Sequence, residues 1–144
     1  MHIPVHFLSL TKYPKKLSSK ITHGIEIIAN PRYLGIQEEE DQNFHVFTYK
    51  IDIVNNSPYR IRLLRRHWNI FVSLLPYQKV SGDGVIGKKP IIECGKRFSY
   101  ESFCLIEGDY GSMEGNYTIH NLDLNEKYQV EIPKFELLST SLLN

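Results

Sequence analysis

Three glycines with the spacing GxGxxG, followed by two lysines, form the candidate phosphate-binding motif of this chain: Gly82, Gly84, Gly87, Lys88 and Lys89. Glycines at such positions expose successive backbone N–H groups that can hold a phosphate, and the lysines add positive charge beside them. A dinucleotide site also needs a helix directly after the glycines, but Pro90 and Gly95 would break that helix within its first turns. The pattern therefore indicates either an anion-binding loop at Gly82–Lys89 or a tight loop whose glycines adopt positive φ.

No other group of polar residues has the linear spacing of a catalytic or metal site. Cys94 and Cys104 lack the CxxC spacing of zinc and redox sites, so we expect free thiols. Ser112 is the second residue of its GSMEG segment, whereas the nucleophile of a GxSxG motif is the third. His67 has no nucleophile or acid near it in sequence, and we expect a packed, hydrogen-bonded histidine beside Trp68. We therefore predict no catalytic residues, no metal ligands, no cofactor and no enzymatic activity.

The net charge of the chain indicates which classes of partner it can attract. The chain has 17 basic and 16 acidic side chains, so no overall field draws it to nucleic acid or to an anionic membrane. The densest basic cluster spans residues 60–67, and its aromatic neighbours Tyr59 and Trp68 could stack on bases. The near-zero net charge disfavours nucleic acid, and a solvated strand face with Trp68 in the core is the preferred interpretation. With no apolar run near the roughly 18 residues that span a bilayer, and no signal-peptide pattern, we expect a cytoplasmic protein without a membrane partner.

Short apolar or alternating runs bounded by turn formers, such as Tyr117, Ile119 and Asn121 on one face, predict an all-β sandwich or barrel. A chain of 144 residues suits one domain, which can bury roughly 68% of its unfolded surface. We place this domain at residues 22–138, between a loosely ordered lead-in at 1–21 and a tail at 139–144. Residues 58–75 have apolar side chains at helical spacing, and periodicity alone supports helix and strand equally.

A series of motifs, in order and at suitable separations, resembles the ApaG domain family. The residues of these motifs, beside the glycine loop, are Arg66, His67, Trp68, Pro90, Tyr100, Met113, Gly115, Tyr117, Pro133 and Phe135. Together they are specific, and the resemblance extends from about Thr22 to Leu138. It implies a fibronectin type III or immunoglobulin-like β-sandwich of about seven strands, in which residues 58–75 are mainly strand. It also implies structural roles for these motif residues.

Two segments depart from the family pattern. The turn after Trp68 is usually a polar, glycine-containing hairpin, whereas residues 72–77 read VSLLPY, and their apolar side chains indicate packing or a contact surface. In the loop after Tyr100, Phe103 stands where the family commonly has glycine, and residues 108–109 read Gly-Asp where it commonly has Thr-Pro.

The resemblance and the lack of a catalytic spacing together favour a binding or protein-interaction module with an unidentified protein partner. The stand-alone bacterial members of the family, also called CorD, are associated with cobalt resistance and magnesium efflux, and the resemblance extends this association to the chain without assigning it a residue. The alternative is a small-molecule sensor that binds pyrophosphate or a nucleotide at Gly82–Lys89, together with a divalent ion. Unpaired sheet edges leave self-association open.

Overall fold

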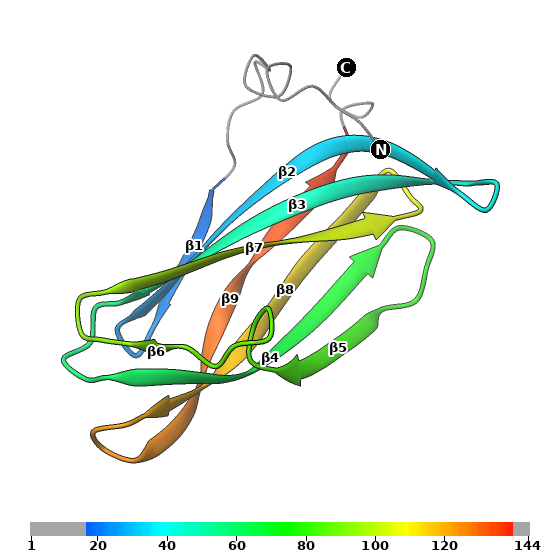
Figure 1. The fold of residues 1–144 in the computed structure, drawn as a ribbon. Coiled ribbons are helices and arrows are strands. Elements are labelled where there is room, and N and C mark those ends of the chain that lie inside the picture. Colours follow the sequence, from blue (N-terminus) through cyan, green and yellow to red (C-terminus); the bar gives the residue numbers. More distant parts are fainter. Residues whose placement is uncertain (1–16, 140–144) are drawn as a thin grey trace.

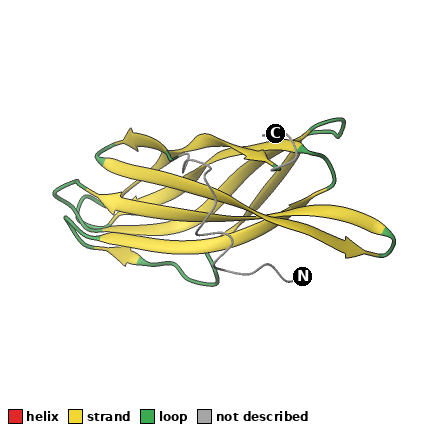
Figure 2. Ribbon diagram, turned by 90° about the horizontal axis from the view of Figure 1, so that it is seen from above, coloured by secondary structure: helices red, strands yellow, loops and turns green. Residues whose placement is uncertain are grey.

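Two antiparallel β-sheets pack against each other in the computed structural model, which describes residues 17–139 (Figure 1). The first sheet has the strand order β1 (Ser18–Thr22), β2 (Ile25–Glu39), β3 (Gln42–Asn55) and β7 (Arg97–Ile106). The second has the order β5 (Gln78–Asp83), β4 (Ile61–Val72), β8 (Tyr110–Asn121) and β9 (Glu126–Leu138), and β6 (Ile91–Ile92) pairs with the start of β4. Figure 2 shows strands and connecting loops but no helix in the described part of the chain. The predicted all-β sandwich is confirmed, with nine strands within residues 17–139 rather than about seven.

The segment with helical spacing in the sequence forms the extended strand β4. A β-bulge interrupts its pairing with β8 between Leu63 and Arg65, so one extra residue shifts the alternation of inward and outward side chains. Ile61 and Leu63 are buried before the bulge, and Trp68 and Val72 are buried after it. The inward-facing Leu63 and Arg66 are therefore three residues apart rather than two, so the strict period of two that marks a strand is lost within this segment.

The structure corrects the N-terminal boundary of the domain. Residues 18–21, which the sequence assigned to a loosely ordered lead-in, belong to β1 and pair with β2. β1 also contacts the second sheet, because Lys20 forms an ion pair with Glu131, and Thr22 Oγ1 accepts a hydrogen bond from the Glu131 N–H (3.2 Å). Backbone pairing holds this polar segment, so its side chains gave no pattern that predicts a strand. Nearly all of the remaining predicted lead-in and tail lies outside the described residues.

The core between the sheets consists of inward-facing aliphatic and aromatic side chains from both. Within it, Tyr49 of β3, Trp68 of β4 and Phe135 of β9 form a triangle of rings whose centroids are 5.5, 5.7 and 6.0 Å apart. The two contacts of Tyr49 cross from one sheet to the other. Aromatic pairs at such distances add about 0.5–1.5 kcal/mol each beyond the burial of their area. This cluster therefore stabilises the packing of one sheet on the other.

Gly115 marks a very close approach of β8 to β4. It follows an irregularity in the pairing of β8 with β9, and it lies opposite Trp68. A Cβ atom at Gly115 would lie 1.9 Å from the carbonyl oxygen of His67 and 3.1 Å from the Cα atom of Trp68. Backbone atoms of a paired strand cannot move aside as the end of a flexible side chain can, so only glycine fits here.

Gly115→Ala is expected to lower the free energy of unfolding by about 3 kcal/mol or more, because the added Cβ must push two paired strands apart. Urea denaturation followed by the fluorescence of Trp68, the single tryptophan, measures this loss. Gly95→Ala is the matched control: Gly95 has a φ of +77° but no neighbouring atom within 4 Å of the added Cβ, so backbone strain alone should cost about 1 kcal/mol. Equal losses in the two variants would contradict the steric argument.

Candidate functional site

The predicted phosphate motif lies at the outer edge of the second sheet, a region that we call the β5 edge. It consists of strand β5, the hairpin tip at residues 73–77 that joins β4 to β5, and the glycine loop at residues 84–89 that follows β5. The Arg-His-Trp triplet at residues 66–68 lies on the adjacent strand β4 and pairs with residues 80–82 of β5. The structure therefore brings the triplet and the glycine motif together.

The glycine loop is a tight turn that uses its own backbone N–H groups. The N–H of Val85 donates to the carbonyl oxygen of Lys88 (2.8 Å), and the N–H of Lys88 donates to the carbonyl oxygen of Val85 (2.9 Å). Ile86 and Gly87 between them both have positive φ, as the central residues of a type I′ turn do. The N–H of Gly84 donates to a carbonyl oxygen of β4 (2.8 Å). Three N–H groups that a phosphate could use are therefore already hydrogen-bonded within the protein.

Local geometry accounts for all three glycines of the motif. Gly84 has a φ of +59°, and a Cβ atom there would lie 2.1 Å from the carbonyl oxygen of Lys88. Gly82 lies within β5, where a Cβ atom would lie 2.8 Å from the guanidinium of Arg66. Gly87 has open space around it and a φ of +74°. The structure thus favours the tight-loop interpretation, and the two lysines lie exposed at the end of the loop.

Arg66 connects the glycine loop to the rest of the sandwich. After the bulge in β4 its half-buried side chain shares the inward face with Trp68. Its Nη1 donates to the carbonyl oxygens of Asp83 (2.9 Å) and Gly84 (3.0 Å), while the guanidinium covers Gly82. Hydrogen bonds from a charged donor are stronger than those between neutral groups, so Arg66 fixes the start of the loop.

The hydroxyl groups of Tyr100 and Tyr117 form a hydrogen bond with each other inside the core. Tyr100 lies on β7 in the first sheet and Tyr117 on β8 in the second, so this bond joins the two sheets. Burial is the main cause that raises the pKa of both hydroxyls well above the usual value for tyrosine, and the charge of Arg66 offsets this only in part. Both hydroxyls are therefore neutral near pH 7, and their bond is structural.

His67 faces the outer side of the second sheet, away from the inward-facing Trp68, whereas the sequence predicted a packed histidine beside that tryptophan. Its Nδ1 lies 3.0 Å from Ser81 Oγ, and its Nε2 lies 3.2 Å from Thr118 Oγ1. It is hydrogen-bonded as predicted, but its partners come from β5 and β8, which linear spacing could not show. Its hydrogen-bond partners within residues 17–139 include no carboxylate, so it lacks the orienting acid of a catalytic triad there.

The other residues of the family motif take part in core packing or in backbone contacts between strands. Met113 and Phe135 are buried and lie opposite each other in the pairing of β8 with β9. Pro133 stands at the irregularity of that pairing, where a residue without an N–H does not interrupt the ladder. The carbonyl oxygen of Pro90 accepts a hydrogen bond from the Leu63 N–H (3.1 Å), which attaches the end of the glycine loop to β4.

The hairpin tip presents apolar side chains to solvent. Leu74 is fully exposed with a φ of +68°, and Leu75 and Tyr77 are 45% and 62% exposed. The Leu75 N–H donates to the carbonyl oxygen of Val72 (3.1 Å), and the ring centroid of Tyr77 lies 5.5 Å from that of Phe71, so the tip is held in place. A non-glycine residue in the left-handed region is strained by about 1–2 kcal/mol. The side chain of Leu74 therefore adds no buried apolar area to the fold, and its backbone is strained.

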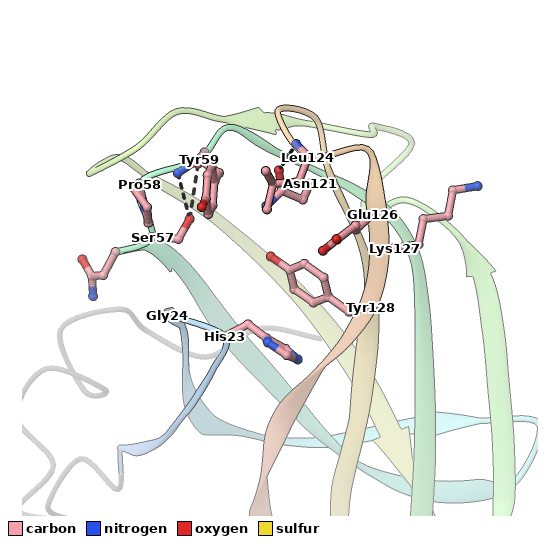
Figure 3. A pocket seen from close by; sticks show the side chains of 11 residues that line it. His23, Gly24, Ser57, Pro58, Tyr59, Asn121, Leu124, Glu126, Lys127 and Tyr128 are labelled. Carbon is pink, nitrogen blue, oxygen red and sulfur yellow. Dashed lines mark hydrogen bonds between the residues drawn. The ribbon is translucent and has the colours of Figure 1, made fainter.

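A pocket of about 600 Å³ lies at the end of the sandwich where β4 begins, and the sequence did not predict it (Figure 3). Three turns form this end pocket: the β1–β2 turn with His23, the β3–β4 turn with Pro58 and Tyr59, and the β8–β9 turn with Leu124. The sequence shows each turn by its turn-forming residues. Nothing in a linear pattern indicates that the three turns meet in space.

Within residues 17–139, no three His, Cys, Asp or Glu side chains converge in a way that could hold a metal ion. The two cysteines are free, as predicted: Cys94 is exposed, and Cys104 on β7 is half-buried. Burial raises the pKa of the Cys104 thiol to about 12. The same part of the chain contains no helix that is long and apolar enough to cross a membrane.

The sequence is similar to a known protein family and to named members of it. Residues 35–121 match the model of a family described as the ApaG domain. A Protein ApaG from Brucella abortus (strain S19) is 37% identical over 119 residues, which cover 83% of this chain and 91% of that protein. A Protein ApaG from Methylobacterium nodulans is 38% identical over 116 residues, covering 81% of this chain and 88% of that protein.

Two solved structures have the same fold. The X-ray structure of the structural genomics target SoR45 superposes with a TM-score of 0.78 at 26% identity, and the match covers 84% of this chain and 91% of that chain. The crystal structure of the putative ApaA protein from Bordetella pertussis superposes with a TM-score of 0.73 at 28% identity, covering 87% of this chain and 96% of that chain.

Tyr117→Phe is expected to lower the free energy of unfolding by about 1–2 kcal/mol, because the buried hydroxyl of Tyr100 loses its partner, and Tyr100→Phe/Tyr117→Phe should recover part of that loss. Burial raises both folded-state pKa values above the unfolded value near 10. The stability contributed by the neutral pair is therefore complete below about pH 10 and falls as the pH rises further. Urea denaturation at about pH 7 and pH 10.5 measures both effects. If the free energy of unfolding fell equally between these two pH values in the wild type and in the double variant, a structural role of the neutral tyrosine pair would be contradicted.

Iodoacetamide at about pH 8 is expected to alkylate Cys94 quickly and Cys104 slowly, because the thiolate is the reactive form and the raised pKa keeps Cys104 protonated. The mass of the intact protein against time gives both rates, and Cys94→Ser isolates the slow one. Urea should make the two thiols react alike. Fast alkylation of Cys104 in the folded Cys94→Ser protein would show that the thiol is not shielded.

Proposed function

The chain belongs to the ApaG domain family, and from this premise we propose that it is a non-enzymatic protein-interaction module whose partner binds along the β5 edge. The observation that carries the proposal is the hairpin tip, where Leu74, Leu75 and Tyr77 expose apolar area on a fixed backbone. Exposed apolar patches with a polar surround are typical of interaction surfaces. A strained leucine that the fold does not need is explained by a partner that buries it.

Strand β5 offers the same partner a second kind of contact. It is the outermost strand on its side of the second sheet, as Figure 1 shows, and among the described residues it pairs only with β4. An outer strand has N–H and C=O groups on its free side that can pair with an extended segment of another protein. Val80, which lies opposite Trp68 and is 43% exposed, adds a further exposed apolar side chain to this strand.

The surroundings of the titratable motif residues support binding rather than catalysis. The Tyr100–Tyr117 pair is buried and neutral, and its hydroxyls are used by each other. The ring nitrogens of His67 contact hydroxyl groups on an open sheet face. A catalytic site instead needs a nucleophile, a base and an orienting group around a concave substrate site.

The interaction surface can be tested by photo-crosslinking in cells that contain the protein. Benzoylphenylalanine in place of Lys79, an exposed residue of β5, is expected to form an adduct of one discrete mass, whereas the same group at the exposed Lys50 of β3 should form none. Leu74→Gly/Leu75→Ser should abolish the adduct without lowering the thermal midpoint, because glycine suits the positive φ of residue 74.

Each result of this experiment decides the proposal. An adduct of twice the mass of the chain identifies a second copy as the partner. No adduct at residue 79, equal adducts at residues 79 and 50, or an adduct that survives removal of the two leucines contradicts an interaction surface at the β5 edge.

A small-molecule sensor that binds pyrophosphate or a nucleotide at Gly82–Lys89 is the second candidate function, and the two exposed lysines at the end of the loop support it. The hydrogen bonds already made by Gly84, Val85 and Lys88 weigh against it. The link to cobalt resistance and magnesium efflux and the cytoplasmic location stay predictions. Within residues 17–139 no three metal-ligating side chains converge, so no metal site in this part of the chain supports the link to cobalt and magnesium.

Pyrophosphate and ATP, each with and without magnesium, are expected to cause no saturable amide shifts at residues 82–89 in an NMR titration to millimolar ligand, because the loop has few N–H groups left to offer. Saturable shifts confined to this loop, and lost in Lys88→Ala/Lys89→Ala, would instead establish the sensor function. Gly84→Val is not a suitable variant here, because its side chain would collide with the carbonyl oxygen of Lys88 and disturb the loop itself.

A further inference from the structure

The end pocket has the dimensions of a ligand site and a wall of rings. Its volume of about 600 Å³ falls within the range of about 300–1,000 Å³ that is usual for pockets that bind small molecules. The imidazole of His23 packs against the ring of Tyr128, with centroids 4.4 Å apart, and forms one wall. Pro58 and Tyr59 from the β3–β4 turn form the facing wall (Figure 3). We call the pocket space between these two walls the slot.

Hydrogen bonds behind the pocket fix all three turns. The buried Asn55 donates through Nδ2 to the carbonyl oxygen of Tyr59 (2.7 Å) and accepts through Oδ1 from the Ser57 N–H (3.0 Å). Asn121, also buried, accepts through Oδ1 from the Leu124 N–H (2.9 Å). The Asn56 N–H donates to a carbonyl oxygen of the β1–β2 turn (2.9 Å), which connects two of the turns. A pocket held in this way loses little entropy when a ligand binds.

The polar groups of the pocket indicate what it can recognise. The hydroxyl of Tyr128 projects into the space between the turns (Figure 3), and within residues 17–139 it has no hydrogen-bond partner. Burial and the nearby Glu126 raise the pKa of Tyr128, so its hydroxyl stays protonated and can donate. Glu126 is exposed at the rim, and it forms no ion pair within the described chain. Lys127 also belongs to the lining, but its side chain extends away from the space between the turns (Figure 3). The pocket therefore offers ring faces, a free donor and the carboxylate of Glu126.

We propose that the end pocket binds an extended, proline-rich segment of a partner protein that carries a basic side chain next to the proline. A proline ring fills the slot between the His23–Tyr128 wall and the Pro58–Tyr59 wall, the Tyr128 hydroxyl donates to a peptide carbonyl, and Glu126 pairs with the basic side chain. Polyproline II segments suit such a slot because their carbonyls are free and their backbone is already extended.

This site is independent of the β5 edge. The pocket lies where β4 begins, and the hairpin tip lies where β4 ends, so the two surfaces are separated by the length of that strand. The failure of either proposal leaves the other standing, because a residue-resolved titration distinguishes the two surfaces.

The test is an NMR titration of the full chain with the synthetic peptide acetyl-PPRPPRPPRP-amide. Saturable amide shifts are expected at residues 23–24, 57–59 and 121–128. Tyr128→Phe and Glu126→Gln should each weaken binding by about fivefold, as expected for the loss of one hydrogen bond or ion pair. Glu101→Gln, at an exposed position of β7, is the matched control and should leave the affinity unchanged.

Two further ligands complete the experiment. The same peptide with every proline replaced by glycine should bind at least about tenfold more weakly, because it lacks the rings and the extended backbone. Adenosine tests whether the slot takes any planar ring. No shifts with the proline peptide at millimolar concentration, equal binding of the glycine peptide, equal shifts with adenosine, or shifts confined to residues 73–89 would each overturn the proposal. The wild-type titration decides it even where a variant fails to fold.

Discussion

The β-bulge at Leu64 adds one residue to β4 between the start of the strand and the Arg-His-Trp triplet. Side chains alternate along a strand, so one inserted residue reverses which of the later residues face the core. After the bulge Arg66 and Trp68 face inward, while Arg65 and His67 face outward. Without it Trp68 would face solvent and the charged Arg65 would face the core. The ring cluster, the attachment of the glycine loop and the open position of the imidazole all follow from this single residue.

The all-β fold and much of the core could be predicted from the sequence because both are recorded in local alternation. Tyr117, Ile119 and Asn121, which the sequence predicted to share one face, are all buried in the structure. β1 could not be predicted in the same way, because its contribution is backbone pairing and an ion pair with Glu131 on the other sheet, and neither leaves a pattern in a five-residue strand with four polar residues. For β4 the family resemblance decided between helix and strand, which periodicity left open because the bulge breaks the alternation that marks a strand.

The candidate site was harder to predict than the fold, because its properties depend on which hydrogen bonds are already made. Glycines that offer N–H groups to an anion and glycines that close a tight turn have the same spacing in a sequence. Only the paired N–H groups of Val85 and Lys88 and the carbonyl opposite Gly84 distinguish the two cases. The apolar hairpin tip was visible as a departure from the family pattern, but its left-handed leucine was not. The end pocket requires three turns that no linear motif connects.

The way in which the end pocket is assembled links recognition to the folding of the whole chain. Its walls come from turns far apart in the sequence, and the His23–Tyr128 contact joins the first sheet to the last strand of the second. The pocket exists only where the two sheets are docked, and proteins dominated by such non-local contacts fold slowly. A partner that binds there therefore selects completely folded molecules, and by mass action it slows their loss to the unfolded state. Because turns of both sheets contribute to its lining, a bound partner would contact both sheets at once.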